Sequence, residues 1–162
     1  MFNQDKFGGG PSSPRLKAGA SGPKSLVNKP SIRELYAALI LSWDEETATN
    51  GDWDMTVLDL NQCAVTALVV QDILGGTLQR AFMTNGDSHY WNKLPDGMEV
   101  DLTRGQFEYL REFPIREEVQ SRPREYVLSF PDTVRRYELL RSRVRRMLPR
   151  VAAIRSAEEA QE

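Results

Sequence analysis

The sequence has little thiol and little imidazole: among its 162 residues there is one cysteine, Cys63, and one histidine, His89. A single cysteine excludes an internal disulfide framework, and a lone thiol is typical of a reducing compartment, so we expect a cytoplasmic protein. One histidine and one cysteine do not make a metal-ligand set. Neither of the two glycine-rich stretches stands between a predicted strand and a predicted helix, which is the context of a phosphate-binding loop. We therefore expect no metal and no other cofactor.

Long hydrophobic runs and an excess of one charge are also missing. The longest strongly apolar run, CAVTALVV at 63–70, is far shorter than the roughly 20 residues of a membrane span. The N-terminus lacks the apolar centre of a secretory signal, so we expect no membrane association. A net charge of -2, with 27% charged and 40% hydrophobic residues, excludes a strongly basic nucleic-acid binder and a wholly disordered chain.

The length suits one domain with tails rather than two domains. Residues 1–29 are rich in Gly, Pro, Ser and Lys and show no apolar period, so we predict a disordered tail that cannot bury enough surface to fold. The predicted domain covers residues 30–155. Residues 156–162, which follow the last apolar positions, are expected to form a frayed C-terminal tail.

The domain opens with two predicted helices. In PSIRELYAALILSW, Ser31 and Glu34 have the spacing of a capping box, and the apolar residues form one helical stripe. In CAVTALVVQDIL, residues 63–74, apolar residues lie on almost every side, which predicts a buried helix. The pair Gly75-Gly76 then supplies a left-handed stop.

Three short strands are predicted next, at residues 77–83, 89–94 and 98–103, and they form an antiparallel meander joined by the turn sequences TNGDS and PDG. RGQFEYLREF starts a short helix, the segment up to Pro131 is ambiguous, and a long Arg-rich helix follows it. The predicted fold class is α+β. A buried helix bearing the cysteine packs on a small antiparallel sheet, followed by the long C-terminal helix.

Cys63 is placed for chemistry by its position in this pattern. With Asn61 as the N-cap, Cys63 lies in the first turn of the buried helix, where unpaired N–H groups and the helix dipole favour negative charge. This location lowers the pKa of a thiol and makes it a better nucleophile. The alternative is that Cys63 packs as a small hydrophobic residue, which is the common role of a buried free cysteine.

The geometry of His89 depends on the turn that follows it. If Pro95-Asp96-Gly97 is a three-residue loop, Trp91 faces Asp101, and His89 and Asp101 become diagonal neighbours on one face of the sheet. Their Cβ atoms would then lie roughly 7 Å apart, within reach of one hydrogen bond between the side chains. A two-residue loop would instead pair Asn92 with Asp101 and make Asn92 the alternative partner of the imidazole.

Together these residues predict a nucleophile, a base and an orienting carboxylate. The backbone N–H of Cys63 and a side-chain amide of Gln62 or Asn61 could hold the developing oxyanion. Trp91 alternates onto the face of His89, where it could cover the imidazole and exclude water, or serve only as a core residue.

The stretch from Asn61 to Phe107, with QCAVTALVVQDILGG, HYWNKLPDG and EVDLTRGQF, resembles the YunG-like family of small bacterial proteins. More distantly, a cysteine at a helix start, His-x-Trp on a strand, a glycine turn and Asp-x-Thr resemble the transglutaminase-like and papain-like cysteine enzymes. That second resemblance implies a papain/transglutaminase-like core and acyl transfer through a thioester at Cys63, His89 and Asp101. The segment between Cys63 and His89 is shorter than in those enzymes and leaves room for few substrate-binding loops.

The expected function is a small cysteine-dependent hydrolase or acyltransferase acting on a peptide, another amide or a thioester. The alternative is a non-catalytic interaction module with the same fold, which binds a protein or polyanion through its Arg-rich helix. That helix carries seven arginines between Thr133 and Arg150, and they could also dock on the acidic loop at residues 44–59 or simply be solvated. The seven are Arg135, Arg136, Arg141, Arg143, Arg145, Arg146 and Arg150.

Overall fold

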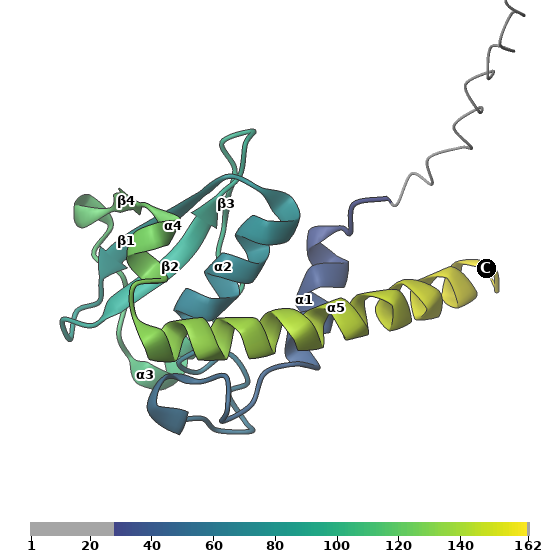
Figure 1. The fold of residues 1–162 in the computed structure, drawn as a ribbon, viewed down its shortest axis with the longest axis horizontal. Coiled ribbons are helices and arrows are strands. Elements are labelled where there is room, and N and C mark those ends of the chain that lie inside the picture. Colours follow the sequence, from purple (N-terminus) through teal and green to yellow (C-terminus); the bar gives the residue numbers. More distant parts are fainter. Residues whose placement is uncertain (1–27, 162) are drawn as a thin grey trace, which may run out of the picture.

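The computed structural model describes residues 28–161, and Figure 1 shows how their elements are arranged. Residues 1–27 of the predicted N-terminal tail, which spans 1–29, lie outside the described residues. Near the end of that predicted tail, the Lys29 ammonium donates a hydrogen bond to the Leu74 carbonyl at 2.8 Å. The fold class is α+β, with a small antiparallel sheet and a long C-terminal helix.

The first helix, α1 (Ile32–Ile40), begins at the predicted capping box. The Ser31 hydroxyl accepts a hydrogen bond from the Glu34 N–H at 3.2 Å, and the Glu34 carboxylate accepts one from the Ser31 N–H at 2.8 Å. These bonds satisfy backbone donors that a helix start leaves unpaired. The helix ends before Trp43, whose buried indole N–H donates to the Thr66 hydroxyl of the next helix at 3.0 Å.

The second helix, α2 (Cys63–Leu74), has the bounds that the sequence predicts. It packs on β2 and on the C-terminal helix, and it is buried along most of its length, which explains why its sequence is apolar on almost every side. Gly75 follows at φ 77°, a conformation that glycine adopts at little cost because it lacks a Cβ. The loop between α1 and α2 contains one short 3-10 helix, η1 (Thr49–Gly51).

Four strands form one antiparallel sheet in the order β3-β2-β1-β4. They are β1 (Thr77–Phe82), β2 (Ser88–Lys93), β3 (Glu99–Val100) and β4 (Gln120–Arg122). The first three form the predicted meander, but the prediction of a strand over residues 98–103 is wrong, because β3 ends at Val100. The Asp101 carboxylate accepts hydrogen bonds from the N–H and hydroxyl of Thr103, and this local turn takes the chain out of the sheet.

The sequence pattern does not reveal β4. Its residues are exposed or half-buried and show no apolar alternation, and it pairs with β1 as a short edge strand. The other short elements after β3 are α3 (Gln106–Leu110), which lies in the predicted helical segment, η2 (Arg116–Glu118) and α4 (Arg124–Val127).

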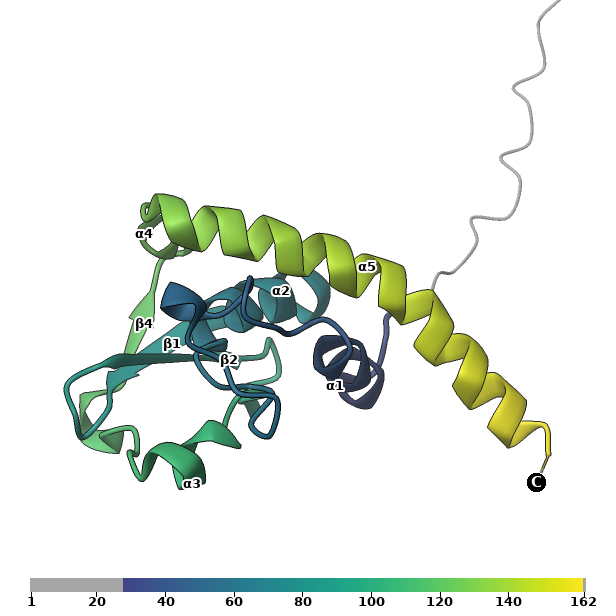
Figure 2. The ribbon, with the colours of Figure 1, turned by 90° about the horizontal axis from the view of Figure 1, so that it is seen from below.

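The last helix, α5 (Pro131–Glu159), packs along α1 and α2. Figure 2 shows α2 and α5 on one side of the sheet and α3 on the other. Apolar residues of this helix reach the core, since Leu140 and Val144 are fully buried and Met147 and Leu148 pack against it. The helix ends at Glu159, so residues 156–159 of the expected frayed tail are helical.

The contact of Gly76 with β2 generates a stability prediction. Gly76 has φ +83°, and a Cβ on it would lie 2.1 Å from the Lys93 carbonyl oxygen, whereas Gly86 has φ +91° and open space around it. We expect Gly86→Ala to lower the free energy of unfolding by about 1 kcal/mol through backbone strain alone. Gly76→Ala adds a backbone clash and should lower it by about 3 kcal/mol or more. Urea denaturation measures both, and equal losses would contradict the close approach.

Candidate active site

The start of α2 lies against an open edge of β2. The Leu94 N–H donates to the Met98 carbonyl at 2.8 Å, and in an antiparallel pair alternate residues direct their peptide groups to the same neighbour. Ser88 and Tyr90 therefore present their peptide groups on the β3 side, at a point where β3 has already ended. The Cys63 sulfur occupies this edge, 3.8 Å from the Ser88 carbonyl oxygen.

The strand register on which the site depends is confirmed. Gly97 has φ 88° at the end of a three-residue loop, and β2 and β3 pair with Asn92 opposite Val100. This register makes His89 and Asp101 diagonal neighbours on one face of the sheet, as predicted.

His89 and Asp101 form a short contact between the two strands' ends. The imidazole Nε2 lies 2.7 Å from Asp101 Oδ2. Asp101 Oδ1 accepts the N–H of Thr103 at 3.0 Å and its hydroxyl at 3.2 Å, so both carboxylate oxygens have partners. Because Asp101 takes Nε2, Nδ1 is the ring nitrogen left to face the thiol.

The pKa values of Cys63 and His89 shift in opposite directions. Burial raises the pKa of the Cys63 thiol, but the hydrogen bond and charge of His89 and the N–H of Tyr90 lower it below its ordinary value. Burial lowers the pKa of His89, but hydrogen bonds with Asp101 and Cys63 and their negative charges raise it to about 9. The arrangement therefore favours a thiolate beside an imidazolium over a neutral thiol beside a neutral ring.

Two aromatic rings enclose the imidazole. Trp91 stacks on His89 with ring centroids 5.8 Å apart and planes at 20°, and Phe107 of α3 meets it edge-on at 4.7 Å. His89 is only 2% exposed as a result. The predicted packing of Trp91 over the imidazole is thus observed, and it keeps water from most of the ring.

A cleft of about 340 Å³ opens over Cys63 and His89. Residues of the η1 loop, the β1–β2 turn and α3 line it, including the carboxylates of Asp52 and Asp87. Cys63 is half-buried, so a reagent in the cleft can reach the sulfur.

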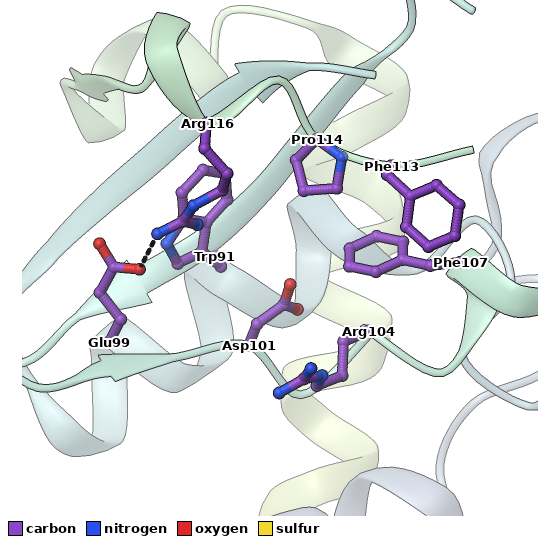
Figure 3. Close-up of a pocket in the computed structure, with 8 residues that line it drawn as sticks. All are labelled: Trp91, Glu99, Asp101, Arg104, Phe107, Phe113, Pro114 and Arg116. Atoms are coloured by element: carbon purple, nitrogen blue, oxygen red, sulfur yellow. Dashed lines mark hydrogen bonds and ion pairs between the residues drawn. The ribbon is translucent and has the colours of Figure 1, made fainter. Parts of the chain in front are cut away.

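A second cavity, of about 450 Å³, borders the carboxylate of Asp101 (Figure 3). Trp91 and Phe107 form walls of this cavity, and the exposed Arg104 and Arg116 contribute polar groups to it. Arg116 lies over the Trp91 ring at 5.2 Å. Asp101 is 18% exposed, so this cavity gives access to the carboxylate, while the cleft gives access to the thiol.

Three polar side chains lie elsewhere than the sequence suggested. Asn61 is not the N-cap of α2: it has φ 58°, and its amide donates to the Asp52 carbonyl at 2.8 Å, while Gln62 occupies the cap position. The Gln62 side chain is fully buried and donates to the Asp44 carbonyl at 2.9 Å, away from the cleft lining. Asn92 faces α2 and donates to the Ala67 carbonyl at 2.9 Å, so it lies on the sheet face opposite His89.

A buried polar network that the sequence did not reveal ties the two halves of the site together. Asp59 Oδ2 accepts the Gln106 N–H at 3.1 Å, the Gln106 side-chain oxygen accepts the Asn61 N–H at 3.2 Å, and its amide donates to the Thr103 carbonyl at 2.8 Å. Burial raises the pKa of Asp59. The network holds the loop before Cys63 against the segment after Asp101, and no local pattern signals such long-range contacts.

The arginines of α5 are divided between internal and exposed positions. Arg143 pairs with Asp44 at 2.7 Å, and Arg136 is buried and donates to the Thr47 carbonyl at 3.2 Å. Docking on the acidic loop of the same chain is thus confirmed for these two. Arg145, Arg146 and Arg150 are exposed.

No group of three or more His, Cys, Asp or Glu side chains suited to a metal ion occurs within residues 28–161. Over the same residues, no helix has the length and apolar character needed to cross a membrane.

Comparisons with known proteins identify a family for this chain. A family model described as YunG protein matches residues 31–149. The chain is 36% identical over 69 residues to the protein of Bacillus subtilis (strain 168) called Uncharacterized protein YunG, a match that covers 41% of this chain and 55% of that protein. The chain thus spans about half the length of this relative. No solved structure gives a significant match.

The single histidine makes the electrostatics of the site directly measurable by NMR. We expect the His89 imidazole to titrate at about 9 in the wild type and at lower pH in Asp101→Asn, because the variant removes a negative charge and an acceptor that favour the protonated ring. Asp87→Asn, which changes an exposed carboxylate of the cleft, is the matched control and should leave the titration near the wild-type value. An unchanged midpoint in Asp101→Asn would contradict the pairing.

Proposed function

The chain belongs to the YunG family, and from the geometry of its cleft we propose that it is a small cysteine-dependent hydrolase or acyltransferase. Its substrate is an amide, such as a peptide bond, or a thioester. Cys63 is the nucleophile, His89 the general acid and base, and Asp101 the orienting carboxylate. The observation that carries the proposal is the 2.7 Å contact of His89 Nε2 with Asp101, which directs the other ring nitrogen to the thiol.

The placement of Cys63 supports a role as nucleophile. The sulfur lies in the first turn of α2, where unpaired N–H groups favour a thiolate. It is half-buried and borders the cleft, unlike a cysteine that serves only as a small core residue. The raised pKa of His89, about 9, and the lowered pKa of Cys63 favour the ion pair that attacks without a prior proton transfer.

In the first half of the reaction, the Cys63 thiolate attacks the carbonyl carbon and the carbonyl electron pair moves to oxygen. As the tetrahedral intermediate collapses, the bond to the leaving amine or thiol breaks. The His89 imidazolium donates its proton to that leaving group. The products are a thioester on Cys63 and a neutral imidazole, whose tautomer Asp101 fixes.

In the second half, the neutral His89 accepts a proton from a water molecule or an amine as that acceptor attacks the thioester. The carbon–sulfur bond breaks, the thiolate returns, and the imidazolium forms again beside Asp101. Trp91 and Phe107 keep the ring enclosed during both halves, which strengthens its electrostatic interactions.

The developing oxyanion is held, in this proposal, by the backbone N–H of Cys63 at the start of α2. The amides of Asn61 and Gln62 are engaged with Asp52 and Asp44, so the side-chain donor expected from the sequence is not carried into the mechanism. A papain/transglutaminase-like arrangement of helix and strand remains part of the proposal, because the cysteine, imidazole and carboxylate occur in the order of those enzymes.

The alternative function is an interaction module that binds a protein or polyanion through α5. The exposed Arg145, Arg146 and Arg150 favour it, because exposed cations along one helix suit phosphate or carboxylate contacts. The reactivity of the Cys63 thiol distinguishes the two functions.

Alkylation of Cys63 by iodoacetamide tests the enzyme proposal. In the wild type we expect rapid alkylation well below the ordinary thiol pKa of 9.0, because the thiolate persists beside the imidazolium. In His89→Ala, burial still raises the pKa of the thiol while the compensating imidazolium is gone, so the rate at pH 7 should fall at least about tenfold. Asp87→Asn serves as the control and should keep the wild-type profile.

Slow alkylation with an ordinary pH profile in both the wild type and His89→Ala would mean a structural thiol. That result would reject the enzyme and leave the interaction module as the function to pursue.

An activated ester tests the covalent step itself. With p-nitrophenyl acetate, we expect a burst of p-nitrophenolate and a mass gain of one acetyl group on the peptide that contains Cys63. Cys63→Ser and His89→Ala should lose the burst, whereas Asp87→Asn should keep it. Acetylation confined to lysines, with no label on Cys63, would contradict a thioester intermediate.

A further inference from the structure

Six arginines of residues 28–161 are buried or half-buried, and three of them have an acidic partner. A fourth, Arg141, donates to the Tyr137 hydroxyl at 3.4 Å. Arg124 pairs with Asp72 at 2.8 Å and Arg136 with Asp132 at 2.7 Å, and Arg143 pairs with acids of the first loop. This pairing is expected, because a guanidinium that leaves water without an anion loses much solvation energy.

Arg80 and Arg122 differ from these four, because their guanidinium groups have neither an ion pair nor a hydrogen bond within residues 28–161. Arg80 is only 6% exposed, Arg122 is half-buried, and the Nε atom of each is buried without a hydrogen-bond acceptor in the described part of the chain. Two donors and two charges are therefore left without partners.

The strand register brings these two side chains together. Leu78 of β1 faces Arg122 of β4, and Arg80 lies two residues further along β1. Arg80 and Arg122 are thus diagonal neighbours on one face of the sheet, with Cβ atoms roughly 7–8 Å apart. Side chains as long as arginine can converge from this spacing, and their like charges repel unless an anion lies between them.

Aromatic rings orient both guanidinium groups. The Arg80 Cζ lies 4.1 Å from the centroid of Phe82, and the Arg122 Cζ lies 5.1 Å from the centroid of Tyr126. A ring against the flat face of a guanidinium leaves the N–H groups, which lie in its plane, free to donate. Those in-plane donors match the two oxygens of a carboxylate or phosphate.

Tyr90 adds a hydroxyl to the same place. It lies directly opposite Arg80 in the β1–β2 ladder and is half-buried. Burial raises the pKa of Tyr90, while the positive charges of Arg80 and Arg122 lower it. The charges of both guanidinium groups therefore act on the Tyr90 phenol.

We infer that Arg80 and Arg122, with the Tyr90 hydroxyl, form a binding site for an anionic oxygen group, the carboxylate or phosphate of a ligand. The site lies on the sheet face that carries α2, and none of the three side chains lines the cleft above Cys63. It is independent of the proposed acyl transfer, although Tyr90 also donates its N–H to the Cys63 thiol.

Titration calorimetry with inorganic phosphate and, separately, with acetate tests the site, at one ionic strength balanced with sodium chloride. We expect the wild type to bind at least one of the two anions at one site, and the stronger of the two identifies the chemistry of the ligand. In Arg122→Gln, which changes a half-buried side chain, the dissociation constant of that anion should rise about tenfold or more because one charged donor is lost.

Two further variants separate this site from general charge effects. Arg145→Gln removes one positive charge from an exposed position of α5 and should bind as the wild type does. Arg80→Lys keeps the charge but loses the Nε donor and the planar pair of guanidinium donors. Its affinity for the anion should therefore fall about tenfold even though the fold is retained. Equal affinities in all four proteins, an equal loss in Arg145→Gln, or no binding of either anion to the wild type would overturn the inference.

Discussion

The candidate active site depends on the early end of β3. One oxygen of Asp101 accepts the N–H of Thr103 and turns the chain out of the sheet, and the other oxygen contacts the His89 imidazole at 2.7 Å. The residue that ends the strand is therefore also the one that orients the ring. If β3 continued to Thr103, its backbone would occupy the edge of β2 where the Cys63 sulfur lies, and a strand would separate thiol from imidazole.

The position of Cys63 along this edge is fixed from both ends of α2. At its C-terminal end, Gly76 allows the close approach of the chain to the carbonyl of Lys93 on β2. At its N-terminal end, Asp59 and Gln106 connect the loop before the helix to the segment after Asp101. Burial raises the pKa of the Asp59 carboxyl, and the backbone N–H groups of Gly105 and Gln106 offset part of that cost.

The parts of this site that could be predicted are those that local chemistry determines. PDG sets a three-residue turn, and period-two alternation then places His89 and Asp101 on one face. The run from Cys63 to Leu74 is apolar on nearly every side, so its burial is also evident. Asp-x-Thr is a local signal as well: it predicts a turn, and it could have shown that β3 ends at Val100. Asn61, Gln62 and β4 were beyond prediction because distant partners decide their conformations.

The arginines show the same limit of prediction from sequence, here for the location of charge. A count along the chain points to α5 as the anion-binding surface, yet Arg136 and Arg143 on that helix are held by the loop at residues 44–47. Arg80 and Arg122 are far apart in sequence and form no cluster in a linear reading, but the β1–β4 register makes them neighbours without an acidic partner in the described chain. What attracts an anion is charge that the fold leaves uncompensated, and this depends on which side chains the strands bring together rather than on how many arginines a segment contains.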